Sequence, residues 1–253
     1  LPVSLTGASV ALPEIGRDLD AGLASVQWVV NGYNATFASF MLATGALADL
    51  FGRRRVFATG VAIFAGAGLL AAVAGDIALL DVLRAVSGVG AAAAATSASA
   101  LLAGTFHGPA RARAFSVFGT AIGAGLAFGP SVAGLLIDTF GWRAGFAAPA
   151  LAGVVVLALV PLLPESRAPH AGRIDWPGTV SFTSALLLLI FGFVQGPEFG
   201  WADPRIVAAF AAALALLVLF ARVERRRADP MFDLTLLASH RFLGICLAAA
   251  TIV

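Results

Sequence analysis

Long apolar stretches, separated by short polar turns, run through almost the whole sequence. Several reach the roughly 20 residues that an α-helix needs to cross the hydrocarbon of a bilayer. Only 12% of the 253 residues are charged, whereas a soluble domain has about 25%. Strict alternation of apolar and polar residues, typical of outer-membrane barrels, is absent. The sequence therefore predicts an all-α integral membrane protein.

The apolar stretches predict eight spans. They cover residues 1–13, 24–49, 56–74, 78–104, 114–137, 144–162, 177–195 and 205–222. We interpret the first as the tail of a truncated helix that ends at Pro13. Polar or glycine-containing segments are expected to join the spans as loops, among them 14–20, 105–113, 138–143 and 196–201.

Arginine placement predicts the orientation of these spans. All 16 basic residues are arginine, and twelve fall in alternate connections, at 50–55, 105–113, 164–176 and 222–241. The opposite connections hold three, and Arg84 lies within a span. Because arginine-rich loops stay in the cytoplasm, these twelve arginines mark the cytoplasmic side. Membrane topology therefore explains the basic net charge, and nucleic-acid binding is not needed to explain it. Abundant Ala, Gly and Arg suit a GC-rich genome, so we expect a multi-pass protein of a bacterial cell (inner) membrane.

A turn between the second and third spans carries the most specific motif. Its residues are Gly45-x-Leu47-Ala48-Asp49-x-x-Gly52-Arg53-Arg54. Gly52 suits a tight turn, since glycine adopts left-handed backbone at little cost. The pattern resembles the signature cytoplasmic loop of the major facilitator superfamily; the alternative is an ordinary charged loop. The resemblance implies that Asp49 joins a charge network, with Arg53 and Arg113 as candidate partners, rather than being merely solvated.

Arg84 lies several residues inside the fourth span. A charge there costs about 3 kcal/mol on insertion scales, so it should face a water-filled cavity or a partner. The alternative is snorkelling to the outer interface, with Asp81 neutralising it. Arg84-x-x-x-Gly88-x-Gly90 resembles a family motif linked to proton transfer. Gly88 also starts a row of small residues that predicts close helix packing.

The fifth span contains a glycine–proline motif of Gly125, Gly129, Pro130 and Gly134. Pro130 is expected to kink the helix. The motif resembles the one typical of drug and proton antiporters, with Ala133 in place of one glycine, and this resemblance implies export. The alternative is a generic glycine-rich membrane helix.

Gln27, Asn31 and Asn34 share one face of the second span. Amides are costly in lipid, so this face should look inward. Two interpretations stay open, namely substrate lining and hydrogen bonding between helices. Many antiporters of the resembled branch carry an acid in the first helix, where this chain has Ser4, which puts the usual proton-coupling acid in doubt.

The order of spans predicts four regions. Residues 1–163 form an N-terminal six-helix transport bundle, and 164–176 a cytoplasmic linker. Residues 177–222 form two accessory transmembrane helices, and 223–253 a cytoplasmic loop and the start of the next half. This arrangement resembles the N-terminal portion of the fourteen-span drug:proton antiporter branch of the superfamily.

The resemblance implies proton-coupled efflux of small amphipathic or drug-like molecules by alternating access. The expected partners are the bilayer, protons, the substrate and a C-terminal half, with no cofactor, metal or nucleic acid. His107, His170 and His240 are far apart and form no constellation for catalysis, so an enzyme is not expected. The alternatives are an exporter of one endogenous metabolite or natural product, and a non-transporting scaffold or sensor.

Overall fold

The computed structural model describes residues 1–167, 175–225 and 244, and the regular structure within these ranges is entirely helical. The helices are α1 (Pro2–Asp18), α2 (Leu23–Phe51), α3 (Arg53–Ala71), α4 (Ile77–Thr105), α5 (Gly108–Phe140), α6 (Trp142–Leu159), the short 3-10 helix η1 (Val160–Leu162), α7 (Trp176–Phe199) and α8 (Pro204–Glu224). This confirms the predicted all-α class. Linker residues 168–174, and nearly all of the predicted loop and next span in 223–253, lie outside the described residues.

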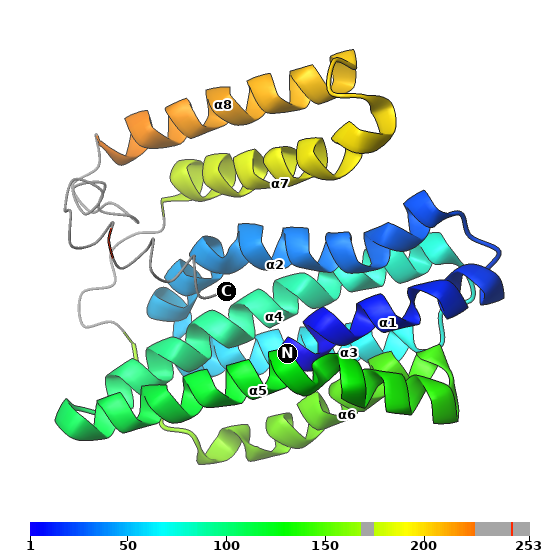
Figure 1. Cartoon of the computed structure of the whole chain (residues 1–253). Coiled ribbons are helices and arrows are strands. Elements are labelled where there is room, and N and C mark those ends of the chain that lie inside the picture. Colours follow the sequence, from blue (N-terminus) through cyan, green and yellow to red (C-terminus); the bar gives the residue numbers. More distant parts are fainter. Residues whose placement is uncertain (168–174, 226–243, 245–253) are drawn as a thin grey trace.

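Helices α1 to α6 pack into one bundle (Figure 1). Its main pairs are α2 with α4, α3 with α4, α1 with α5, and α3 with α6. Small residues permit this packing, because a Cβ on Gly90 would lie 2.7 Å from the carbonyl oxygen of Gly60 on the facing helix. Near one end of the bundle, Trp142 and Leu80 are fully buried within an apolar core. Close backbone approach therefore holds the bundle together, as is usual where lipid removes the hydrophobic driving force.

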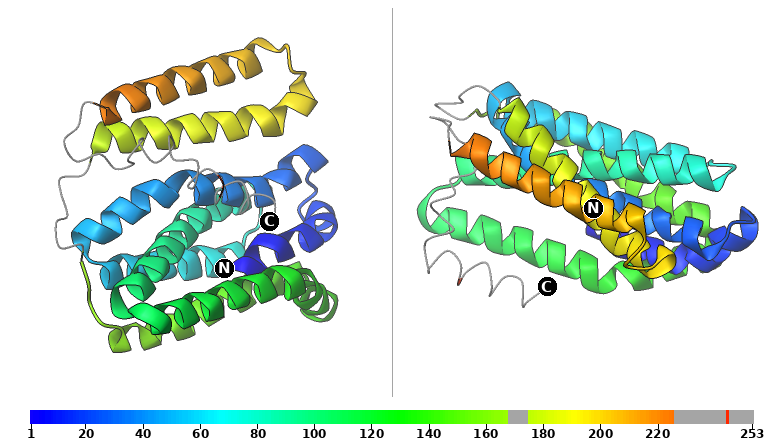
Figure 2. Two further views of the ribbon diagram at one scale, coloured as in Figure 1. Left: turned by 60° about the vertical axis from the view of Figure 1, so that its left-hand side comes forward. Right: turned by 90° about the horizontal axis from the view of Figure 1, so that it is seen from above.

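Helices α7 and α8 form a hairpin that lies beside α2, outside the six-helix bundle (Figure 2). The rings of Phe182 and Phe220 lie 5.1 Å apart between the two helices. The hairpin meets α2 through the stacked rings of Trp28 and Phe191, whose centroids are 6.4 Å apart. Thr183 adds a hydrogen bond from its hydroxyl to the carbonyl of Ser39. The hairpin is thus attached to the bundle through α2.

Among the described residues, six helices, α3 to α8, are long and apolar enough to cross a membrane. α1, with 17 residues, and α2, with 29, are not among these six. The connections alternate between two ends, with α2–α3, α4–α5 and α6–α7 meeting at the left in Figure 1. The arginine-rich turns share that end, which the positive-inside rule assigns to the cytoplasm.

Several predicted loops are wrong, because the helices continue further than the apolar residues do. The turns predicted around residues 50–55, 138–143 and 196–201 shorten at Gly52, Gly141 and Gly200. These glycines have φ values of 108°, 79° and 93°, which only glycine adopts readily. The three arginines after Gly52 accordingly lie in the first turn of α3 and not in a loop.

Two polar segments predicted as loops are also helical. α1 continues through Pro13 to Asp18, whose carboxylate accepts hydrogen bonds from Trp142 and Arg143 of α6. These tertiary contacts stabilise the extra turn. α5 begins at Gly108, with Pro109 in its first turn, where the missing N–H of proline costs nothing. Arg111 therefore lies on a helix as well.

Candidate functional site

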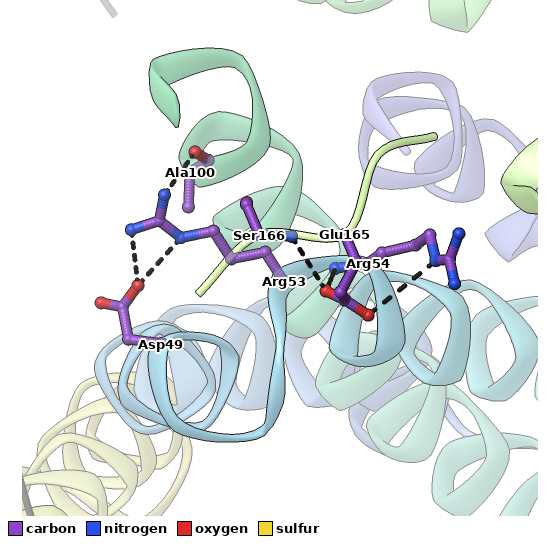
Figure 3. A network of polar contacts seen from close by, with 6 residues as sticks. All are labelled: Asp49, Arg53, Arg54, Ala100, Glu165 and Ser166. Atoms are coloured by element: carbon purple, nitrogen blue, oxygen red, sulfur yellow. Dashed lines mark hydrogen bonds and ion pairs between the residues drawn. The ribbon is translucent and has the colours of Figure 1, made fainter. Parts of the chain in front are cut away.

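The turn between α2 and α3 holds an ion pair at the cytoplasmic end of the bundle (Figure 3). Arg53 donates from Nη2 and Nε to Oδ1 of Asp49, at 2.8 and 3.0 Å. Its Nη1 donates to the carbonyl of Ala100 in α4, at 3.1 Å. The guanidinium therefore joins α2, α3 and α4. Of the two candidate partners, Arg53 contacts Asp49, while Arg113 is exposed on α5.

The linker after α6 returns to this turn (Figure 3). Oε1 of Glu165 accepts a hydrogen bond from the backbone N–H of Arg54 at 3.1 Å, and the carbonyl of Ser166 accepts one from the N–H of Arg53 at 2.9 Å. Oε2 of Glu165 also lies 3.8 Å from Nε of Arg55. Because the first N–H groups of a helix have no partner within it, Glu165 and Ser166 act as the cap of α3.

Two of the remaining signature residues, Leu47 and Gly52, have steric roles. Leu47 packs against the buried residues Ala48, Val56 and Ala93. A Cβ on Gly52 would lie 2.9 Å from Oε1 of Glu165, so the glycine also makes room for the cap. Gly45 has open space around it. The structure thus brings Asp49, Gly52, Arg53 and Arg54 together and leaves Gly45 at the edge.

Arg84 lies inside the bundle, with 2% of its surface exposed. Its Nε donates to the carbonyl of Val29 in α2 at 2.9 Å. In α1, Ser4 accepts twice, at its hydroxyl from Nη1 (3.2 Å) and at its carbonyl from Nη2 (3.3 Å). The guanidinium carbon is 4.3 Å from the ring centroid of Tyr33. Hydrogen bonds and this desolvated cation–π contact offset the cost of burying the charge.

Of the two environments expected for Arg84, a water-filled cavity or a partner, the structure shows partners, and the buried side chain does not snorkel outward. Its partners are protein groups from α1 and α2, together with the ring of Phe146 in α6, 5.3 Å away. No ion pair joins Arg84 to a carboxylate in the part of the chain that the structure describes. Asp81, one turn earlier, does not neutralise it by contact. The arginine is a buried cation held by neutral groups.

The glycines of both helix motifs serve close packing. Gly88 faces α2, and a Cβ there would clash with the hydroxyl of Thr36 and the carbonyl of Tyr33. This close approach of α2 and α4 agrees with the close helix packing that the row of small residues starting at Gly88 predicts. On α5, a Cβ on Gly125 would lie 2.8 Å from Pro2 of α1.

The α5 motif continues this contact with α1. A Cβ on Gly129 would collide with Oγ1 of Thr6, and Gly7 fits against Ala133 in the same way. Gly134 is looser, with Val10 at 4.0 Å. Pro130 lies inside α5. The antiporter-like motif is thus the surface on which α1 and α5 meet.

The three amides of α2 lie apart from these contacts. Gln27 is exposed, and Asn31 and Asn34 are half-buried. No hydrogen bond joins their side chains to another described residue, which removes the support for hydrogen bonding between helices within these ranges. A cavity of about 620 Å³ inside the bundle is lined by Tyr33 and Phe37 of α2 and by apolar residues of the other five helices. Gln27, Asn31 and Asn34 do not line this cavity, and Oδ1 of Asn34 is buried without a hydrogen-bond partner among the described residues.

A second ion pair closes the opposite end of the bundle. Nη1 of Arg143 lies 2.6 Å from Oδ2 of Asp18, and Nη2 donates to the carbonyl of Ala74 at 3.4 Å. The guanidinium of Arg143 and the indole N–H of Trp142 hold the pKa of Asp18 below its ordinary value. The pair joins α1 and α6, and Arg143 adds the turn that follows α3.

Sequence reasoning missed the roles of Glu165 and Phe146. A signal for Glu165 was present, because it follows the sixth span at the same end as the arginine cluster. Nothing in the sequence singles out Phe146, since it is one of 19 phenylalanines.

Comparison with known proteins identifies the relatives of the chain. The family model described as "Major Facilitator Superfamily" matches residues 2–252. The puromycin resistance protein pur8 of Streptomyces alboniger is 39% identical, over 94% of this chain and 48% of its own length. The multidrug resistance protein Stp of Mycobacterium tuberculosis is 35% identical, over 96% and 45%. The tetracenomycin C resistance and export protein of Streptomyces glaucescens is 33% identical, over 98% and 45%. The chain thus spans about half the length of these curated relatives.

Proposed function

Because the chain belongs to the major facilitator superfamily, we propose that it is the N-terminal part of a transporter that exports small amphipathic or drug-like molecules. The observation that carries this proposal is the alignment, along nearly the whole chain, with proteins named for drug resistance or export. The activity that we propose is therefore transport across the membrane, and no enzymatic activity is proposed.

The proposed mechanism is alternating access between two six-helix halves. Helices α1 to α6 would form one half, and a C-terminal half the other. In such transporters the substrate binds near the bilayer midplane at the junction of the halves. The amide face of α2, formed by Gln27, Asn31 and Asn34, is the proposed lining on this side, because its polar groups have no described partner and are costly in lipid.

The cytoplasmic network around Arg53 is the proposed device that stabilises one of the two states. It joins three helices and the linker through partly exposed side chains. Such contacts contribute little individually, so they can break and reform as the halves move. The tight α1–α5 contact at Gly129 supports movement of these two helices as a unit.

A proton gradient across the inner membrane of a bacterium is the proposed energy source, with no cofactor. Ser4 carries no titratable group, and its hydroxyl is already bound to Arg84. The proposed proton-coupling acid is therefore a different one, either an acid that works together with Arg84 or an acid in the C-terminal half.

The test uses the full-length protein in proteoliposomes. An imposed pH gradient should drive uptake or release of puromycin, tetracenomycin C or fluorescent dyes, and a protonophore should abolish the flux. Asp49→Asn should slow this flux, whereas Asp138→Asn, outside the network, is the matched control. An absence of pH-dependent flux over a broad panel of compounds would end the antiport proposal.

A second candidate is export of one compound. Two of the relatives are each named for a single antibiotic, puromycin or tetracenomycin C. Competition separates the candidates, because a multidrug exporter is inhibited by many unrelated compounds and a dedicated exporter by close analogues of its substrate.

A further inference from the structure

The buried positive charge of Arg84 has an unusual set of neighbours. Its hydrogen-bond acceptors are the carbonyl of Val29 and the hydroxyl and carbonyl of Ser4. Its other close contacts are the rings of Tyr33 and Phe146. All of these groups are neutral. Within the described residues, the cluster therefore keeps the full charge of the guanidinium.

The residue at position 4, here Ser4, determines whether the positive charge of Arg84 is neutralised from α1. Its hydroxyl lies 3.2 Å from Nη1 of Arg84, and the serine itself is only 5% exposed. A carboxylate at this position would lie within reach of an ion pair and would cancel the charge. Asp81, one turn nearer the outer end of α4, makes no ion pair with Arg84 among the described residues.

The charge lies across α2 from the amide face. Arg84 contacts Val29 and Tyr33, which are fully buried on the bundle side of α2. At 3.6 residues per turn, Gln27, Asn31 and Asn34 lie about 140–200° around the helix from Val29 and about 100–160° from Tyr33. A molecule held against the amides is therefore separated from the guanidinium by about one helix diameter, roughly 10 Å.

We infer that Ser4, by leaving Arg84 without an acidic counter-ion among the described residues, makes this transporter select neutral or anionic amphipathic molecules and disfavour cationic ones. The inference rests on the proposed export function, because it assigns the charge class of the substrate. At about 10 Å and an effective dielectric constant of about 20, one unit charge changes the affinity of a charged ligand about tenfold. Burial protects this interaction from screening by salt.

The test compares two dyes that share one skeleton and differ in charge, anionic fluorescein and cationic rhodamine 123. Their binding to the purified full-length protein in nanodiscs is measured by fluorescence polarisation. The wild type should bind fluorescein more tightly. Ser4→Asp should shift the ratio of the two affinities about tenfold toward rhodamine 123. Ser4→Asn, which has the same shape without the charge, should keep the wild-type ratio whatever it does to overall affinity.

The opposite results overturn the inference. They are equal ratios in the Asp and Asn variants, a wild-type preference for rhodamine 123, or no binding of either dye. Should Ser4→Asp fail to fold, Arg84→Gln should move the ratio in the same direction, and Arg84→Lys should not. A gradient-driven flux assay on the same variants reconstituted in proteoliposomes separates the two proposals. Binding with the expected ratio but without flux contradicts export alone, and flux with an unmoved ratio contradicts the charge selection alone.

Discussion

Replacing Glu165 with alanine should loosen the start of α3 by about 1–2 kcal/mol. Its Oε1 accepts the N–H of Arg54 at 3.1 Å, and loss of a helix cap typically costs about 1 kcal/mol. A negative charge at a helix N-terminus adds about 0.3–1 kcal/mol. The contacts with Arg54 and Arg55 are long, at 3.9 and 3.8 Å, and the arginine side chains are 37% and 69% exposed, so they add little.

Hydrogen exchange at the first turn of α3 measures this change directly. A loss of about 1–2 kcal/mol raises the population of the open state about 5–30-fold. Mass spectrometry of full-length protein should therefore show exchange at the Arg54 amide accelerated by that factor in Glu165→Ala. Glu165→Gln keeps an acceptor oxygen and loses the charge, so its effect should be smaller.

The control is Glu198→Ala, which removes an exposed carboxylate of α7 at the opposite end. It should leave the exchange of α3 unchanged. If Glu165→Ala also left the Arg54 amide within twofold of the wild type, the capping role of the linker would be refuted.

Three further predictions concern stability of the full-length protein, measured as its melting temperature in detergent. Gly129→Leu should lower it, because overpacking costs about 1–3 kcal/mol where α5 meets α1, whereas Gly123→Leu, where a Cβ meets open space, should not. Tyr33→Phe should leave it unchanged or raise it, since the hydroxyl is buried without a partner, but Tyr33→Leu should lower it by removing the ring stacked on Arg84. The pKa of Asp18 is held below its ordinary value of 3.8. Its contribution to the stability of the folded protein is therefore present above that pH and is lost as the pH falls through the lower pKa of the folded state. Asp18→Asn should abolish this loss of stability, and a loss that persisted in the variant would belong to another carboxylate.

The order and orientation of the helices could be predicted because they depend on local properties. Each apolar stretch is long enough to span a bilayer on its own, and arginine marks alternate turns. Gly52 could be recognised as the turn because glycine tolerates its positive φ. Helix ends were less predictable. α1 continues to Asp18, whose carboxylate is bound by Trp142 and Arg143, more than 120 residues later in the chain.

The surroundings of Arg84 could not be predicted for the same physical reason. Its cost in lipid indicates that it must have partners, but the groups that bind it come from α1, α2 and α6. Backbone carbonyls, such as that of Val29, leave no mark in a sequence. The contact between Asp49 and Arg53 was easier to predict, because the two residues are four positions apart. The remaining contact of the Arg53 guanidinium is again with a backbone carbonyl, that of Ala100.

The attachment of Ser166 to the start of α3 sets the length of the tether to the accessory hairpin. The chain leaves the bundle at Ser166, hydrogen-bonded to Arg53, and α7 is capped by Asp175. Nine peptide links separate these two residues (175 − 166 = 9), and at about 3.3–3.6 Å each they reach about 30 Å at most. Without the hydrogen bond between Ser166 and Arg53, a longer stretch of chain would separate the last contact with the bundle from the cap of α7.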